Sequence, residues 1–214
     1  MVFNGIDLIG YEIGNRQSAI GNASAPVLGY LARMSKDKGL DTLVEAFIAL
    51  KQRGHVARLK LQIAGSCGPS DESFVKSLRK RLGEAGYIGD VAFLPNLTRA
   101  EKIDFLRGLT VFSAPALYGE AFGLYVIEAQ AAGVPVVQPR HAAFPEILEA
   151  TGGGVLCEPG DVKSLADKLE ALLLNPSQAQ TLGEIGRRNT FEKFSVAAMT
   201  RDTLRVFEIV NRKS

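Results

Sequence analysis

Short apolar runs alternate with amphipathic stretches along most of the chain, and these two patterns predict strands and helices in turn. The runs are four to six residues long and mostly apolar, which is typical of strands buried on both faces. They cover residues 27–31, 59–64, 91–94, 111–114, 134–137 and 154–157.

The segments between the runs carry apolar residues every three or four positions, as a helix with one buried face requires. Leu40, Leu43 and Phe47 are an example. Thr98 and Glu101 have the spacing of a capping box, which predicts a helix start. Helices are expected from about 39 to 50, over 72–85, 98–107 and 123–132, from 161 to about 172, from 175 onward, and from 195 to about 210.

This alternation predicts an α/β fold, in which a parallel sheet is covered by helices on both faces. Open sheets of this kind bind ligands at the carboxyl ends of their strands. The loops that follow the strands are therefore the places to look for chemistry. They are residues 32–38, 65–70, 95–97, 115–123 and 138–144.

The loop between Gly29 and Gly39 carries Arg33, Lys36 and Lys38 just before a predicted helix. A helix amino terminus offers free N–H groups and partial positive charge, and added cations would make it a good diphosphate site. A solvated basic loop is the alternative interpretation of the same residues.

A second candidate segment, 118–137, places Glu120 before a predicted helix and Glu128 within it. A carboxylate only accepts hydrogen bonds, so either residue suits sugar or ribose hydroxyls. A capping carboxylate and an exposed helix glutamate remain the simpler alternative. A hydrolase with paired carboxylates is disfavoured, because eight helical positions span about 12 Å and glycosidase pairs lie roughly 5–10 Å apart.

The third candidate segment, 136–148, follows a predicted strand and holds Arg140 and His141. Both side chains could face the same edge of the sheet. A histidine there is a candidate general base, although a lone loop histidine is more often solvated.

Composition narrows the functional classes. The 214 residues fit one large domain or one domain with appended segments. A formal net charge of +2 gives no electrostatic footprint for nucleic acid. Cys67 and Cys157 are expected to be buried thiols rather than a disulfide, and with His55 and His141 they form no metal pattern. Since neither a signal peptide nor a spanning segment is visible, a cytoplasmic protein is expected.

The segment that begins at Glu120 resembles the signature of the large group-1 (family four) retaining glycosyltransferases. That signature has two glutamates separated by seven residues, the first followed by x-Phe-Gly, and a later Gly-x-Pro-Val. It runs here as Glu120-Ala-Phe122-Gly123, then Glu128-Ala129, then Ala132-Gly133-Val134-Pro135-Val136. Four more segments resemble motifs of that family in the same order: Asn4-Gly-Ile-Asp7, Gly29 to Arg33 and Lys38-Gly39, Gly154 to Asp161, and Phe194-Ser195.

The resemblance implies a GT-B fold, in which two Rossmann-like domains face each other across a cleft. This chain resembles only the carboxy-terminal half, so one Rossmann-like half of a GT-B fold is expected. Residues 1–24 would be an interdomain segment, 25–192 the nucleotide-sugar-binding domain, and 193–214 the closing C-terminal helix. The acceptor domain would be missing, and the chain alone would be inactive. Contact with a membrane surface would run through the missing half.

The resemblance also implies catalytic roles. Arg33 and Lys38 would neutralise the diphosphate as it leaves, and Glu120 would hold hydroxyls of the transferred sugar. Transfer would retain the anomeric configuration, as in a front-face displacement. Fixed cations stabilise a departing diphosphate without reorganisation, so no metal or other cofactor is expected.

The donor-binding roles implied by the resemblance fall mainly on the same segment. Glu128 would hold the ribose, backbone N–H groups of Gly123 and Leu124 would meet the phosphates next to Phe122, and the backbone around Leu94 would meet the base. The partner is thus a nucleoside-diphosphate sugar. The base, the sugar, the acceptor and the oligomeric state stay open.

Two departures from the family pattern stand near the site. Pro115-Ala116 replaces the usual Pro-Ser, and Ala142-Ala143 replaces a frequent Gly-Gly. A sugar-nucleotide epimerase of the same fold is the rival enzyme, with His141 and Glu146 as its spare acid and base. A non-catalytic nucleotide-sugar-binding module is the rival without an activity.

Overall fold

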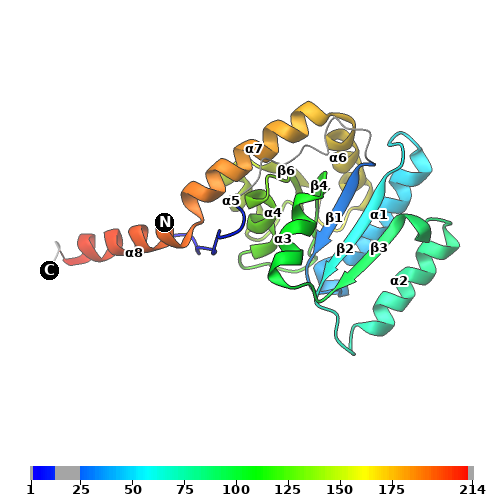
Figure 1. Ribbon diagram of the computed structural model, residues 1–214, viewed down its shortest axis with the longest axis horizontal. Coiled ribbons are helices and arrows are strands. Elements are labelled where there is room, and N and C mark those ends of the chain that lie inside the picture. The colour runs from blue at the N-terminus through cyan, green and yellow to red at the C-terminus, as the bar shows by residue number, and fades with distance from the viewer. Residues whose placement is uncertain (1, 13–24, 212–214) are drawn as a thin grey trace.

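The computed structural model describes residues 2–12 and 25–211. These residues contain one sheet of six parallel strands with helices on both faces (Figure 1). The strands are β1 (Val27–Leu31), β2 (Lys60–Gly65), β3 (Val91–Pro95), β4 (Val111–Phe112), β5 (Val136–Pro139) and β6 (Gly154–Cys157). The expected α/β fold with a Rossmann-like sheet is confirmed.

The strands lie in the order β3-β2-β1-β4-β5-β6. The chain first builds outward from β1 to β3 and then returns to the other side of β1. The order therefore reverses between β1 and β4, where Leu28 pairs with Val111. Sheets of this type bind ligands in the crevice outside such a reversal.

The helices are α1 (Leu40–Arg53), α2 (Glu72–Glu84), α3 (Arg99–Arg107), α4 (Leu124–Ala131), α5 (Phe144–Thr151), α6 (Val162–Leu174), α7 (Pro176–Lys193) and α8 (Val196–Asn211), with 3-10 turns at Lys36–Lys38 and Ile88–Asp90. Helix α1 packs with α2 and α6, while α4 and α5 pack against α7. The two groups cover opposite faces of the sheet, so its central strands β1, β4 and β5 are buried on both sides.

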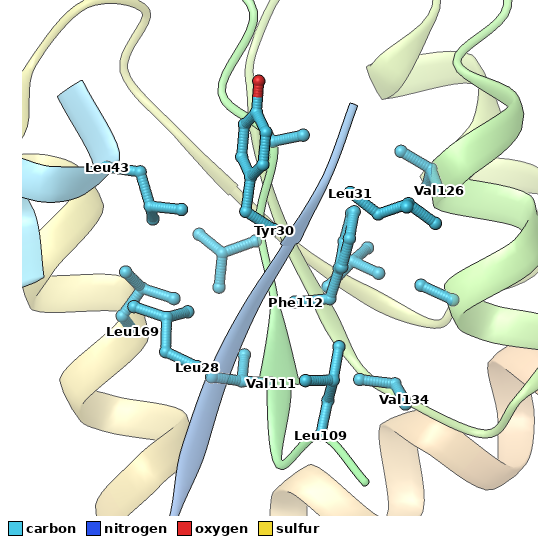
Figure 2. Close-up of a cluster of buried hydrophobic side chains, with 14 of the residues drawn as sticks. Leu28, Tyr30, Leu31, Leu43, Leu109, Val111, Phe112, Val126, Val134 and Leu169 are labelled. Atoms are coloured by element: carbon cyan, nitrogen blue, oxygen red, sulfur yellow. The ribbon is translucent and has the colours of Figure 1, made fainter. Parts of the chain in front are cut away.

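The central strand β1 sends alternate side chains to the two faces (Figure 2). Leu28 and Tyr30 lie on the side of Leu43 from α1, whereas Leu31 lies on the side of Val126 from α4. All of these side chains are at most 8% exposed. A strand that fills two cores must be apolar at consecutive positions, which explains the continuous runs in the sequence.

The predicted caps are present. The Thr98 hydroxyl accepts from the N–H of Glu101, whose carboxylate accepts from the N–H of Thr98 at 2.8 Å. Asp161 caps α6 through the N–H of Ser164 at 3.0 Å. Local side-chain chemistry therefore fixes these starts, as the sequence indicated.

One predicted loop is partly helical. The segment 138–144 was expected to be a loop, but α5 begins at Phe144. Pro145 stands in its first turn, where its missing N–H costs nothing. Strand bounds also shift: β4 ends at Phe112 and β5 begins at Val136, because the sheet pairing stops or starts there.

The amino-terminal segment 2–12 docks against the end of the chain and against α3. Ile6 forms an isolated parallel bridge with Ser195, and its N–H donates to the carbonyl of Phe194 at 2.8 Å. Arg99 donates to the carbonyl of Asp7 at 3.0 Å. Helix α8 extends away from the body of the domain (Figure 1). The predicted divisions at 25 and 193 stay predictions, and residues 1, 13–24 and 212–214 lie outside the described residues.

Candidate functional site

The loops at the carboxyl ends of the strands are joined to one another through the backbone. Each bond below runs from a backbone N–H of one loop to a carbonyl of another. They are Met34 to Ser66 at 2.9 Å, Asn96 to Gly65 at 2.9 Å, Leu117 to Asp37 at 3.0 Å and Ala143 to Glu120 at 3.2 Å. The five loops thus form one continuous edge, as the sequence predicted.

At the reversal between β1 and β4, the loop after β1 lies directly against the loop after β4. Gly39, the residue before α1, has φ +72°, and a Cβ there would lie 1.9 Å from the carbonyl oxygen of Pro115. Only glycine suits that backbone conformation and that contact. The close approach brings Lys38 next to the segment that holds Glu120.

Lys38 and Glu120 form an ion pair at this point. The Nζ of Lys38 lies 2.6 Å from Oε2 of Glu120, and the two side chains are only 17% and 16% exposed. Lys38 also donates to the hydroxyl of Tyr118 at 3.2 Å, and the hydroxyl of Tyr125 donates to Oε2 of Glu120 at 2.9 Å. These four side chains are called the Lys38–Glu120 cluster below.

The protonation states of the cluster follow from its contacts. Burial opposes the charge on Lys38, but hydrogen bonds with Glu120 and Tyr118 outweigh burial and raise the pKa of Lys38 above 10.5. Burial, followed by the charge of Glu120, raises the pKa of Tyr125. At neutral pH the cluster therefore contains a charged ammonium and a neutral phenol, both donating to one carboxylate.

Arg33 pairs with a different acid, Asp71. Its Nη2 donates to Oδ1 of Asp71 at 2.8 Å and to the hydroxyl of Ser70 at 3.2 Å. The Asp71 carboxylate also accepts from the N–H of Gly68 at 3.0 Å. The Arg33 contact, together with the Gly68 N–H, lowers the pKa of Asp71. Since the Arg33 side chain is 52% exposed, part of the guanidinium stays accessible.

Glu128 also has its own partner. Its Oε1 lies 2.5 Å from the Nζ of Lys102 on α3, and the two side chains are 18% and 25% exposed. The structure therefore brings Lys38 and Glu120 into contact, while Arg33 pairs with Asp71 and Glu128 pairs with Lys102. The roles assigned to these residues from the family resemblance stay predictions.

The remaining donor-binding candidates lie on the same edge of the sheet. Gly123 has φ +71° and precedes α4, and Leu124 begins that helix with a side chain 53% exposed. Phe122 is partly buried, 6.1 Å from the ring of Phe194. Leu94 lies near the carboxyl end of the edge strand β3, paired with Ala64.

His141, the candidate base, contacts the loop after β4. Its Nε2 lies 2.9 Å from the carbonyl oxygen of Ala116, to which it donates. Arg140 lies 3.9 Å from Glu158. The histidine thus joins two loops of the edge, in addition to any chemistry.

The family model described as "Glycosyl transferases group 1" matches residues 15–189. The chain belongs to the group 1 glycosyltransferases.

Within this family, the chain is 31% identical over 176 residues to the capsular polysaccharide biosynthesis glycosyltransferase CapM of Staphylococcus aureus. The match covers 79% of this chain and 42% of CapM, so the chain spans less than half of that relative. The group 1 resemblance expected from the motifs is confirmed.

Two solved structures show the same fold. The C-terminal domain of the group 1 protein LpcC from Francisella tularensis has a TM-score of 0.76 and 25% identity, and the match covers 90% of this chain and 100% of that one. HepE from Anabaena, solved in complex with UDP, has a TM-score of 0.82 and 20% identity over 97% of this chain and 56% of its own. This group 1 chain therefore has the architecture of one half of a GT-B fold.

The sequence interpretation missed four partners of the candidate residues: Asp71, Lys102, Tyr118 and Tyr125. Tyr118 and Tyr125 lie two and five positions from Glu120 in the sequence, and this short separation could have indicated that they contact it or its partner. Asp71 is 38 positions from Arg33 and reads as an ordinary residue before a helix. Lys102 follows the capping box of α3, and no local pattern relates it to Glu128.

Within residues 2–12 and 25–211, no three His, Cys, Asp or Glu side chains are grouped so that they could hold a metal ion. The expectation that no metal or cofactor takes part stays a prediction.

No helix of those ranges combines the length and apolar character needed to cross a bilayer. Cys67 and Cys157 are both free thiols, and only Cys157 is buried.

Proposed function

We propose that this chain is the donor-binding domain of a retaining glycosyltransferase, which transfers a sugar from a nucleoside-diphosphate sugar to an acceptor. The observation that carries the proposal is the Lys38–Glu120 pair at the reversal of strand order. A cation for phosphate and an acceptor for hydroxyls meet there, at the place where sheets of this type bind ligands. The acceptor half is proposed to correspond to the part of longer relatives such as CapM that this chain does not cover.

Two helix amino termini support a diphosphate at this place. Helices α1 and α4 begin after Gly39 and Gly123, and neither has a side-chain cap among the described residues. Their first N–H groups carry partial positive charge and suit an anion. Lys38 stands beside both, because its Nζ reaches Glu120 in the segment just before α4.

In the proposed mechanism, Lys38 and the accessible part of Arg33 stabilise the charge that develops on the departing diphosphate. Glu120 holds hydroxyls of the sugar so that its anomeric carbon stays near the diphosphate. Attack by the acceptor on the same face, as the diphosphate leaves, would retain the anomeric configuration. Lys38 is well suited to this role because its raised pKa keeps it charged at neutral pH.

Glu128 is proposed to hold the ribose, with Lys102 fixing its carboxylate. Its Oε1 accepts from Lys102, and within residues 2–12 and 25–211 no other side chain donates to the carboxylate, so Oε2 would be the acceptor for a diol. The solved complexes of HepE with UDP and with UDP-glucose make uridine nucleotides the first ligands to test.

The test is calorimetric titration of the domain with UDP, GDP and ADP. Binding of at least one is expected, and Glu128→Ala is expected to weaken it by about 1–3 kcal/mol, the range for losing a hydrogen-bonded acceptor. Glu170→Ala is the matched control, since Glu170 is 16% exposed and paired with Arg53 on the α1–α6 face.

No binding of any of the three nucleotides would contradict the proposed function. Equal effects of Glu128→Ala and Glu170→Ala would contradict the ribose role alone. Sugar transfer by this domain alone would contradict the proposal that it binds only the donor and needs a second half to bind the acceptor.

A further inference from the structure

The two carboxylate oxygens of Glu120 differ in their hydrogen bonds. Its Oε2 accepts two hydrogen bonds, from Lys38 at 2.6 Å and from the Tyr125 hydroxyl at 2.9 Å. Within the described residues, no group donates to Oε1. Because the side chain is 16% exposed, water has limited access to this carboxylate. The fully buried side-chain polar atoms that lack a partner do not include Oε1, so this oxygen stays accessible. An accessible carboxylate oxygen without a donor is suited to receive one from a ligand.

Lys38 alone would not fix this arrangement. The last torsion of a glutamate side chain is broad and nearly two-fold, so one ammonium can bind either oxygen or both. A second donor aimed at Oε2 from another direction removes that freedom. Tyr125 is that donor, and it comes from α4, five residues after Glu120 and across the turn at Gly123.

The Tyr125 ring is itself held in place. It lies 6.2 Å from the ring of Phe112 on β4 and 6.4 Å from that of Phe144 on α5, in tilted geometries. The Nζ of Lys38 lies 5.9 Å from its centroid. Burial and the neighbouring Glu120 raise the pKa of the Tyr125 hydroxyl, so it remains a protonated donor. A rigid ring and a constant donor are what a positioning role requires.

We propose that Tyr125 is a positioning residue, which turns Oε1 of Glu120 toward a hydroxyl of the donor sugar by holding Oε2. This inference rests on the proposed function, in which Glu120 binds that sugar. Without the phenol, the carboxylate can turn both oxygens toward Lys38 and withdraw its acceptor from the sugar. The loss then falls on the sugar part of the ligand and spares the nucleotide part.

The test compares a nucleoside diphosphate with its sugar conjugate: UDP with UDP-glucose, and GDP with GDP-mannose. Tyr125→Phe keeps the ring contacts and removes only the hydroxyl. It is expected to reduce the extra affinity for the sugar conjugate by roughly 5- to 20-fold and to leave affinity for the bare diphosphate unchanged. Glu120→Asp, which is too short to reach both donors, is expected to produce the same selective loss.

Two further variants separate positioning from a general structural effect. Tyr118→Phe removes the other phenol, which contacts Lys38 and not Glu120. Its effect is expected to be the same on bare diphosphate and on sugar conjugate. In a Glu120→Ala background, Tyr125→Phe should have no further effect, because it acts only through Glu120.

The outcomes are distinguishable from failure of the proposed function. If the unmodified domain binds none of the diphosphates, both the function and the inference fall. If it binds them but Tyr125→Phe leaves the sugar increment intact, only the inference is overturned. An equal loss for bare diphosphate and sugar conjugate, or a loss that persists in Glu120→Ala, also overturns it.

Discussion

The contact between Gly39 and Pro115 makes a quantitative prediction. Gly39 has φ +72°, and an added Cβ would lie 1.9 Å from the carbonyl oxygen of Pro115. That separation is about 1 Å below the shortest that real Cβ atoms show. Gly39→Ala must therefore both strain its own backbone and push the loop after β1 away from the loop after β4.

The opposite end of the same helix provides a matched control. Gly54 ends α1 with φ +71°, and an added Cβ there would meet nothing within 4 Å. Gly54→Ala thus carries only the left-handed backbone cost, about 1 kcal/mol. Gly39→Ala carries the same cost plus about 1–3 kcal/mol for forcing atoms into a filled space. The difference between the two variants isolates the contact with Pro115.

The assay is thermal and urea unfolding followed by circular dichroism. For a domain of this size, about 1 kcal/mol lowers the melting temperature by roughly 2–4 °C. Gly54→Ala should shift it by that much, and Gly39→Ala by roughly 4–16 °C. Because Lys38 precedes Gly39, nucleotide affinity should fall only in Gly39→Ala. Equal unfolding shifts for the two variants would refute the argument that close approach of these loops requires glycine.

Two other predictions concern residues near the same edge. Ala142 has φ +54°, so Ala142→Gly should raise the free energy of unfolding, measured by urea denaturation, by about 0.5 kcal/mol. Its neighbour Ala143 has φ −74°, so Ala143→Gly should lower that free energy by about 0.5–1 kcal/mol. A lower free energy of unfolding in both variants would contradict the backbone strain at Ala142. Burial raises the pKa of the Cys157 thiol to about 12, so a thiol reagent should label one cysteine, Cys67, in the folded domain and two in denaturant. Rapid labelling of both thiols before unfolding would contradict it.

The sequence pattern was sufficient for most of the helices and strands and for the edge of the sheet that carries the site. Continuous apolar runs indicated strands buried on both faces, and Thr98 and Asp161 marked helix starts through their own side-chain chemistry. The pattern missed α5, which is only eight residues long and has no side-chain cap. Pro145 and Glu146 in its first turn were the available signals.

The order of strands and the pairing of charges were beyond the pattern. Nothing local indicates that β4 lies beside β1, because strands β2 and β3 and helices α1, α2 and α3 come between them in the chain. Arg33 and Asp71 meet for the same reason, and so do Lys102 and Glu128. The motif resemblance identified the candidate residues, but their partners follow from long-range packing.

Backbone hydrogen bonds join the five loops, so the shape of this edge depends little on which side chains the loops carry. Since carbonyls and N–H groups supply the links, side chains along the rim can be exchanged without dismantling the support beneath them. Leu117, Tyr118 and Leu124 are each at least 41% exposed there. Single substitutions can therefore change ligand specificity while the backbone structure of the loops stays the same. These three positions are practical sites for engineering that specificity.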